Sequence, residues 1–410
     1  IFFPAALNKG LPAYKKTSPI PIILYSEQKL INLQPMLKII LISPPVFDFY
    51  FTPARKEPLG LLYLKESVVE QCRDVSVDIY DTLASGKVKK IKLPGCFEYL
   101  KSLYIEDYSC FSLFSNYYRF GDSTVKILQK IKTGKYDVAG ISALFSGYFP
   151  DVENLIRAIK KDTSTTVIVG GWAVSTEGKS LVKESEADFF LNGCGENSFP
   201  KFVKEFIGER NYDQVPGLLY RNKNIIYENR VIYREKIPSY FPKRENGYYC
   251  LNKRIARVIL SKGCLNKCNF CAVHKNRVFS IRSFQSIERE LAYLLASGIE
   301  IVNFEDDNLF YNKEYSLQLL KILKKYHTKG LVYTAMNGIT AANVQSLIPH
   351  MIEAGFVELN FSLVTSNNKL INRYRRPFAL DEINELVTRV QGKIKTIIFI
   401  ILGLPGDSPQ

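Results

Sequence analysis

The sequence predicts an α/β protein with two parallel sheets. The first is a doubly wound sheet, and the second is a partial βα barrel that stops after about five strands. Short apolar strands alternate with helical segments through both halves of the chain, a pattern typical of parallel sheets. The 410 residues suffice for more than one core, and 46% of them are hydrophobic.

Charge and cysteine content narrow the class of protein. With 55 Lys and Arg against 40 Asp and Glu, the net charge of +15 is spread along the whole chain. We interpret it as a solvated basic surface and do not expect nucleic acid as a partner. The longest apolar run, near 396–404, is shorter than the roughly 18 residues of a membrane span. Five scattered cysteines predict a reducing, cytoplasmic location: Cys72, Cys96, Cys110, Cys194 and Cys250.

The first half is expected to fold into the doubly wound sheet. Residues 1–36 contain five prolines and predict an irregular lead-in, and strands and helices alternate from 37 to about 210. The predicted strands are 38–43, 75–80, 137–142, 166–170 and 187–191, and the predicted helices run from 58 towards 72, from 152 to 161 and from 197 to 206. Ligands of such sheets bind beyond the carboxyl ends of the strands.

Residues 85–135 interrupt this pattern with basic residues that flank aromatic ones. Such a composition can bind single-stranded nucleic acid by stacking and phosphate contact. We favour an amphipathic insertion whose aromatic side chains pack over the sheet or cap a ligand, because aromatic residues are usually core residues. A hairpin-like pair, 217–220 and 225–227, and a Pro- and Tyr-rich linker fill residues 211–253.

Residues 254–410 repeat a βα unit, which predicts a parallel barrel with its active site at the carboxyl ends of the strands. The predicted strands begin near 254 and then occupy 299–304, 331–335, 356–363 and 396–402, with helices at 286–297, 313–325 and 380–390. Ser286 is the expected N-cap of the first helix. Because the sequence starts at Ile and stops after the fifth strand, we expect a fragment of a longer protein.

The first of these strands leads into Cys264, Cys268 and Cys271, spaced C-x₃-C-x₂-C. Three thiolates this close can hold one thiophilic centre. Structural zinc usually takes four ligands, and His274 could supply the fourth. An iron–sulfur cubane held by three cysteines instead keeps one iron open for a substrate. The three cysteines are therefore predicted metal ligands, with zinc as the alternative.

This spacing, with Phe270 before the last cysteine, resembles the signature of the radical S-adenosylmethionine (SAM) enzymes. The resemblance implies a [4Fe–4S] cluster that binds SAM and cleaves it reductively to a 5′-deoxyadenosyl radical. The implied SAM contacts are Glu305, Asp306, Asp307, Ser362, Thr365, Gly403 and Gly406. Where the family often has Gly-x-Glu-Ser, this sequence reads Ser362-Leu-Val-Thr365, without the carboxylate. His274 and Lys275 are expected to be structural or to tune the cluster.

The order of segments in residues 37–210 resembles the cobalamin-binding domain that precedes the radical SAM core in one branch of this family. The resembling segments are Pro58-Leu-Gly-Leu-Leu-Tyr63, Tyr136-Asp-Val-Ala-Gly-Ile-Ser142, Val169-Gly-Gly171 and Gly193-Cys-Gly-Glu196. The implied cobalamin contacts are Ser142, Gly170, Gly171, Gly193 and Glu196. The histidines of the chain are His274, His327 and His350, so no histidine of this domain can coordinate cobalt.

The two resemblances together imply a cobalamin-dependent radical SAM enzyme, foremost a C-methyltransferase that draws its methyl group from methylcobalamin. Cyclisation, rearrangement or a reaction without cobalamin are the alternatives, and a zinc-stabilised nucleic-acid-binding protein is a remote one. Expected partners are a small-molecule, lipid or peptide substrate and a reductant such as flavodoxin or ferredoxin. No catalytic residue is assigned beyond the cluster ligands.

Overall fold

The computed structural model describes residues 37–50, 57–103, 114–232, 237–245, 247–250, 252–271, 279–340, 344–376 and 380–407, which belong to one compact unit spanning 35–410. The predicted lead-in, 1–36, lies outside the described residues, as do His274 and Lys275. Within the described ranges, no helix is long and apolar enough to cross a membrane.

The first half forms a seven-stranded sheet in the order β10-β9-β8-β7-β6-β1-β3. Its strands are β1 (Leu37–Ser43), β3 (Val75–Asp81), β6 (Val138–Ser142), β7 (Thr166–Gly170), β8 (Phe189–Leu191), β9 (Leu218–Asn222) and β10 (Ile225–Glu228). β3, β1, β6, β7 and β8 are parallel, whereas β9 is antiparallel to both β8 and β10. The winding reverses between β1 and β6, which is where doubly wound sheets bind ligands.

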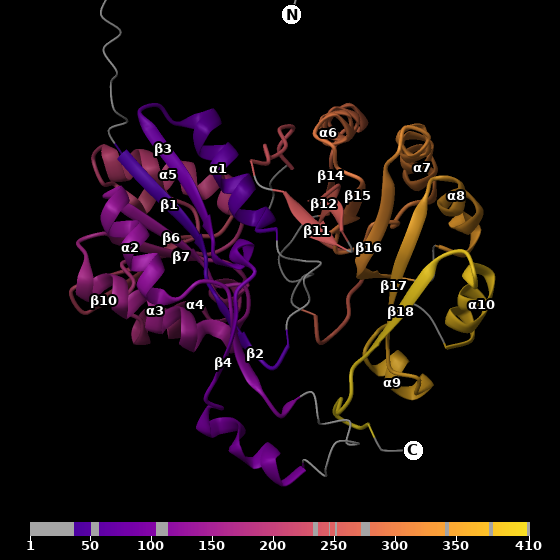
Figure 1. Cartoon of the computed structure of the whole chain (residues 1–410), viewed down its shortest axis with the longest axis horizontal. Helices are drawn as coiled ribbons and strands as arrows, with labels where there is room; N and C mark the ends of the chain where they lie inside the picture. The colour runs from indigo at the N-terminus through magenta and orange to yellow at the C-terminus, as the bar shows by residue number, and fades with distance from the viewer. Residues whose placement is uncertain are drawn as a thin grey trace, which may run out of the picture. The chain divides into compact units, whose positions relative to one another are not determined.

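Helices cover both faces of this sheet (Figure 1). Consecutive residues of its strands are apolar and point to opposite faces, so both faces are apolar. The helices are α1 (Leu59–Gln71), α2 (Thr124–Gly134), α3 (Phe149–Asp162), α4 (Trp172–Glu184) and α5 (Gly195–Ile207). Ile39 and Leu41 of β1 pack with α1 and α5. Ile40 and Ile42 of the same strand face the other side and pack with α2, α3 and α4. The prediction of a doubly wound parallel sheet is therefore confirmed.

The predicted insertion supplies two strands of a three-stranded antiparallel sheet in the order β2-β5-β4, and the third strand, β2, precedes the insertion in the chain. Its strands are β2 (Val46–Asp48), β4 (Val88–Ile91) and β5 (Tyr117–Phe120), and a 3₁₀ helix, Gly95–Leu103, follows β4. The ring of Phe49 lies edge-on to those of Phe97 and Tyr117, with centroids 5.1 and 5.0 Å apart, so aromatic residues pack on one another here. The insertion ends before 135, however, because Ile127 and Ile131 of α2 are buried against the main sheet.

The second half forms a six-stranded sheet in the order β11-β12-β15-β16-β17-β18. Its strands are β11 (Tyr248–Cys250), β12 (Lys253–Val258), β15 (Ile301–Phe304), β16 (Val332–Ile339), β17 (Phe356–Val364) and β18 (Lys395–Ile400). β11 is antiparallel to β12, and the other five strands are parallel and follow one another in chain order, as the βα repeat predicts.

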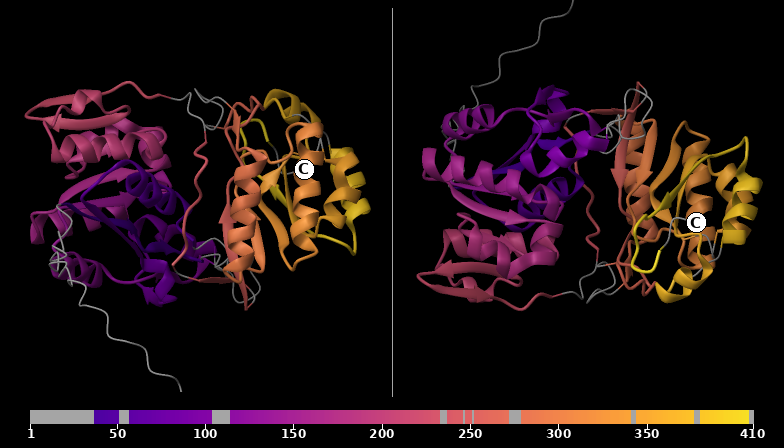
Figure 2. Two further views of the ribbon diagram at one scale, coloured as in Figure 1. Left: turned by 90° about the horizontal axis from the view of Figure 1, so that it is seen from above. Right: turned by 90° about the horizontal axis from the view of Figure 1, so that it is seen from below.

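Helices alternate with these strands, as Figure 2 shows in orange to yellow from two further sides. They are α6 (Phe284–Ala296), α7 (Lys313–His327), α8 (Ile348–Glu353), α9 (Asn368–Arg373) and α10 (Leu380–Val390). The predicted N-cap of α6 was wrong. Ser283 rather than Ser286 is the N-cap, because the Ser283 hydroxyl accepts a hydrogen bond from the N–H of Ser286.

Three adjacent strands of this second sheet, β15, β16 and β17, each place a buried polar side chain on the face opposite their apolar core residues. Val302 and Phe304 of β15 belong to the core that the helices cover. Asn303 lies between them and points to the opposite face, because successive side chains of a strand alternate. Thr334 of β16 and Asn360 of β17 repeat this arrangement, and both are only 3% exposed. In these three strands, the face opposite the helix-covered core therefore has a buried polar group at its centre.

Candidate active site at the cysteine loop

The acidic residues that follow β15 hold the segment that leads into the cysteines. The carboxylate of Asp306 accepts hydrogen bonds from the N–H of Leu260, 3.1 Å from Oδ2, and from both the N–H and the hydroxyl of Ser261. Asp307 accepts a hydrogen bond from the N–H of Gly263 at 3.1 Å. Gly263 has a φ of 85°, which favours glycine. The end of β15 thus fixes the backbone just before Cys264.

This role of Asp306 differs from the predicted contact with SAM. The side chain is buried, and its carboxylate is used within the protein. Burial raises the pKa of Asp306 to about 7, although the hydrogen bonds from Ser261 and Leu260 oppose the shift. Glu305 and Asp307 are half-buried, so the prediction of a SAM contact stays with them. Glu305 also accepts a hydrogen bond from Nε of Arg257 at 2.9 Å.

The donor set of the cysteine loop fits an iron–sulfur cluster. Cys264, Cys268 and Cys271 are all free of disulfides, and the N–H of Cys271 donates to the carbonyl of Cys268 at 3.1 Å. Burial raises the pKa of the Cys264 thiol, and the negative charge of Asp307 adds to this shift. No three His, Cys, Asp or Glu side chains of the described chain converge on a single metal ion. A cubane does not require that, because each cysteine binds a different iron.

The remaining predicted SAM residues lie at the carboxyl ends of β17 and β18. Ser362 is half-buried, and the buried hydroxyl of Thr365 accepts a hydrogen bond from the N–H of Asn367 at 3.2 Å. Gly403 and Gly406 have φ angles of 77° and 92°, in the left-handed region. Val364, at the position where the family often has Glu, has a φ of 75°, at a shift in the pairing of β17 with β18. A β-branched residue in this conformation is strained, and such strain is often found at functional sites.

Sequence analysis missed the polar residues on the inner face of the strands. Oγ1 of Thr334 donates to Oδ1 of Asn303 at 2.8 Å, and Nδ2 of Asn360 donates to the carbonyl of Met336 at 3.2 Å. Oδ1 of Asn360 is buried without a hydrogen-bond partner among the described residues, so it can accept from a ligand. The signal in the sequence was a single polar residue between two apolar ones: Val302-Asn-Phe304, Tyr333-Thr-Ala335 and Leu359-Asn-Phe361.

The predicted cobalamin residues all lie at the carboxyl edge of the seven-stranded sheet. Ser142 and Gly170 end β6 and β7, Gly171 precedes α4, Gly193 follows β8, and Glu196 lies in the first turn of α5. A Cβ on Gly171 would lie 2.4 Å from the carbonyl oxygen of Ala143, so packing alone requires glycine there. Among the described residues, a Cβ on Gly170 would meet only the Leu191 carbonyl within 4 Å, so these residues leave room for a ligand at Gly170.

Glu196 connects this edge to the cysteine loop. Its carboxylate pairs with the ammonium group of Lys262, two residues before Cys264. The predicted contact of Glu196 with cobalamin therefore competes with an ion pair inside the protein. The pair brings the carboxyl edge of the seven-stranded sheet into direct contact with the segment that carries the cluster ligands.

A buried chain of alternating charges also joins the two sheets. In order, it consists of Arg282, Glu290, Arg244, Glu57, Arg257 and Glu305. Arg244 binds Glu57 at 2.7 Å and Glu290 at 3.2 Å, and its side chain is 5% exposed. The backbone N–H of Arg257 donates to the carboxylate of Glu57, and the guanidinium of Arg257 donates to the backbone carbonyl of Glu57. The chain ends at Glu305, a predicted SAM contact.

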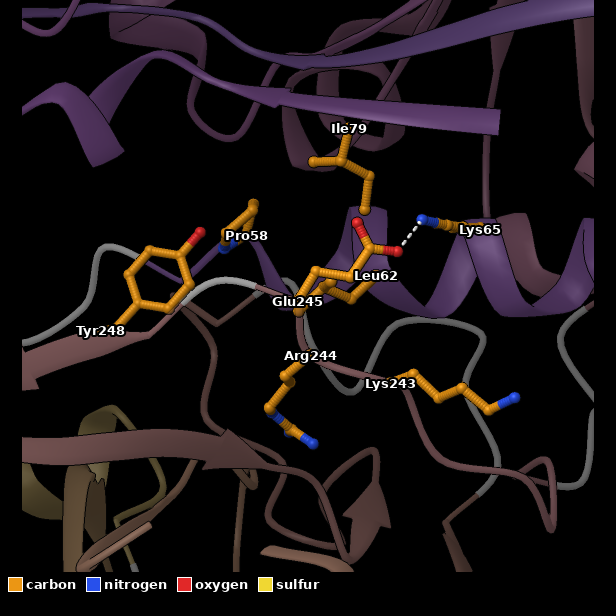
Figure 3. A pocket seen from close by; sticks show the side chains of 8 residues that line it. All are labelled: Pro58, Leu62, Lys65, Ile79, Lys243, Arg244, Glu245 and Tyr248. Atoms are coloured by element: carbon orange, nitrogen blue, oxygen red, sulfur yellow. Dashed lines mark hydrogen bonds and ion pairs between the residues drawn. The ribbon is translucent and has the colours of Figure 1, made fainter. Parts of the chain in front are cut away.

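A pocket lies beside this charge chain, as Figure 3 shows. It is lined by Pro58, Leu62, Lys65, Ile79, Lys243, Arg244, Glu245 and Tyr248. Lys65 and Glu245 form an ion pair across it at 2.6 Å. Its volume of about 30 Å³ holds one or two water molecules, so it is too small for SAM or cobalamin. The pocket therefore belongs to the contact between the sheets and not to the cofactor sites.

Comparison with known proteins agrees with the cysteine loop and the fold. The sequence profile of the radical SAM superfamily matches residues 258–410. A curated relative, cytidylyl-2-hydroxyethylphosphonate methyltransferase from Streptomyces wedmorensis, is 21% identical over 416 residues, which cover 90% of this chain and 73% of the relative.

Two solved structures share the fold of both halves. The radical SAM methyltransferase TsrM from Kitasatospora setae, with cobalamin and a [4Fe–4S] cluster bound, has a TM-score of 0.68 at 13% identity, covering 91% of this chain and 70% of TsrM. The cobalamin-dependent SAM radical enzyme OxsB, with aqua-cobalamin and SAM bound, has a TM-score of 0.65 at 15% identity. That match covers 90% of this chain and half of OxsB. Residues 258–410 are therefore a radical SAM domain, which uses a [4Fe–4S] cluster and SAM, and the protein is an enzyme of the radical SAM superfamily with the fold of its cobalamin-dependent branch.

Proposed function

We propose that the protein is a cobalamin-dependent radical SAM methyltransferase that acts on a small molecule. The observation that carries this proposal is the ion pair between Lys262 and Glu196, because it joins the segment before the cluster ligands to the carboxyl edge of a doubly wound sheet. Radical methylation with two cofactors requires both to reach one substrate, and this contact supports neighbouring sites for the two. The methyltransferase relatives support the same reaction class.

Separate groups of residues would bind the cluster, SAM and cobalamin. Cys264, Cys268 and Cys271 hold the cluster, which supplies one-electron cleavage of SAM when it is bound. Asp306 and Asp307 position the loop that carries these cysteines. Glu305, Asp307, Ser362, Thr365, Gly403 and Gly406 would contact SAM. Ser142, Gly170, Gly171 and Gly193 would border cobalamin, and this domain has no histidine that could coordinate cobalt.

The substrate binds against the polar inner face of the second sheet. Asn303, Thr334 and Asn360 are fixed by hydrogen bonds to neighbouring strands, so their remaining polar atoms are oriented before a substrate arrives. Such a face suits a substrate with its own donors and acceptors better than a lipid. The electron comes from an external one-electron donor such as flavodoxin or ferredoxin.

The test is anaerobic reconstitution with iron, sulfide and hydroxocobalamin, followed by metal analysis after desalting. We expect about four irons and one cobalt per chain, and methyl transfer from SAM to an acceptor of the phosphonate class that the Streptomyces relative methylates. The variant with Cys264, Cys268 and Cys271 changed to Ala should lose the iron, whereas Cys250→Ala, outside the loop, should keep it. Four irons without cobalt would contradict the methyltransferase proposal.

A loaded enzyme that consumes SAM but leaves the methyl group on its sulfur would instead favour cyclisation or rearrangement. Mass spectrometry of the acceptor and of the SAM-derived products separates the two results, because methyl transfer consumes a second SAM and yields S-adenosylhomocysteine.

A further inference from the structure

The end of α9 and the residues after it, 373–376, lie against residues 268–270 of the cysteine loop. Nδ2 of Asn269 donates to the carbonyl of Arg373 at 3.0 Å. The rings of Phe270 and Tyr374 meet edge to face, with centroids 5.9 Å apart. Consecutive residues of the loop therefore contact consecutive residues of this segment.

The closest contact reaches a cluster ligand. Nη1 of Arg376 donates to Sγ of Cys268 at 3.1 Å, well within hydrogen-bond distance of sulfur, and Cys268 is 3% exposed. Nη2 of the same guanidinium donates to the carbonyl of Ser362 in β17. Arg376 thus has one donor on the sulfur and another on the strand, so its orientation is set by the sheet as well as by the loop.

The turn before Arg376 explains this orientation. Arg375 has a φ of 54°, and the N–H of Arg376 donates to the carbonyl of Ile371 at 2.9 Å. This closes the end of α9 and turns the chain back towards the cysteines. The side chain of Arg375 is exposed, in contrast to that of Arg376. The two adjacent arginines therefore carry the same charge near the cluster, but only Arg376 directs a donor at sulfur.

We propose that Arg376 is a positioning residue that sets the reduction potential of the [4Fe–4S] cluster through its hydrogen bond to Cys268. Reduction adds one electron from an external one-electron donor and breaks no bond, so the sulfur ligands become more negative. An N–H donor and a positive charge at sulfur stabilise the reduced form and raise the potential. This inference rests on the cluster of the radical SAM domain and is independent of cobalamin and of methyl transfer.

The experiment is a redox titration of the reconstituted full chain, without substrate or cobalamin, followed by electron paramagnetic resonance of the reduced cluster. Arg376→Gln should shift the midpoint potential to more negative values, by on the order of a tenfold change in the reduction equilibrium, or about 59 mV for one electron. Arg376→Lys should shift it less, because a charge remains without the planar fork. Arg375→Gln is the matched control and should leave the potential close to that of the wild type.

Equal potentials for wild type and Arg376→Gln at equal iron content would overturn the inference, as would equal shifts for Arg375→Gln and Arg376→Gln. If Arg376→Gln fails to retain iron, Arg376→Lys decides: an unchanged potential in that variant contradicts the proposal, and a negative shift supports it. Failure of the methyltransferase proposal would appear in cobalt content and products instead, so the two results are separable.

Discussion

Lys262 and Glu196 form an ion pair between the strand that leads into the cysteine loop and the first turn of α5. Their side chains are 25% and 14% exposed, so solvent screens the pair less than it screens a pair on the open surface. The contact fixes the start of the cluster loop to an element of the other sheet. Both residues have further interactions within the chain, so their coupling has to be isolated experimentally.

A double-mutant cycle measures this coupling. We expect Lys262→Met and Glu196→Gln, alone and combined, to give a coupling energy of about 1 kcal/mol in urea unfolding. The pair Lys324 and Glu353, each 55% exposed, is the matched control and should give a value near zero. Indistinguishable coupling energies for the two pairs would show that the contact between the sheets contributes no more than a surface ion pair.

Asp306 should make the stability of the chain depend on pH. Burial raises its pKa from 3.8 to about 7 in the folded state. Between these pH values the folded chain keeps a proton that the unfolded chain has released, so the free energy of unfolding falls as pH rises. Asp306→Asn removes this contribution, and its free energy of unfolding should decline less steeply between pH 4 and 7. Urea unfolding at several pH values tests this, and parallel curves for the two proteins would refute it.

The buried charge chain should be sensitive to the loss of a single member. Glu57→Gln leaves Arg244 buried with one anionic partner fewer, and we expect a loss of about 3 kcal/mol or more in the free energy of unfolding. Glu245→Gln, next to Arg244 but with a side chain 78% exposed, should change stability by less than about 0.5 kcal/mol. Chemical unfolding at one pH compares them, and similar losses would argue against a special role for the buried chain.

Two glycines should respond in opposite directions to alanine. Gly171 has a φ of 121°, and a Cβ there would lie 2.4 Å from a backbone oxygen, so Gly171→Ala should cost about 2 kcal/mol or more. A Cβ on Gly60, in α1, would meet no atom of the described residues within 4 Å, and Gly60→Ala should stabilise the chain by about 0.5 kcal/mol. Thermal unfolding of both variants checks the signs. A stable Gly171→Ala protein would mean that the turn between β7 and α4 adapts.

The sequence predicted the strands well because their apolar runs are short and bounded by turn residues, as in β1 and β7. It did not reveal α4, whose Gly178 has non-helical dihedral angles and interrupts the helical pattern. The sequence also predicted that Asp306 contacts SAM, because a carboxylate at a strand end suits an ammonium group. The sequence pattern does not show whether that carboxylate is buried. Burial depends on partners distant in the chain, here Leu260 and Ser261, and local patterns cannot show them.

The buried charge chain also bears on how this enzyme could be rebuilt. Its members come from positions 57, 244, 257, 282, 290 and 305, which lie before, within and after the linker. The contact between the two sheets therefore depends on residues from all three segments. A chimera that exchanged only the first sheet with that of a relative would bring a foreign residue to face Arg244 and Arg257. Transplanting the sheet would therefore require carrying these arginines along or redesigning their partners together. A chimera therefore has to exchange the paired charges together, because a single junction in the chain cannot keep all of the pairs matched.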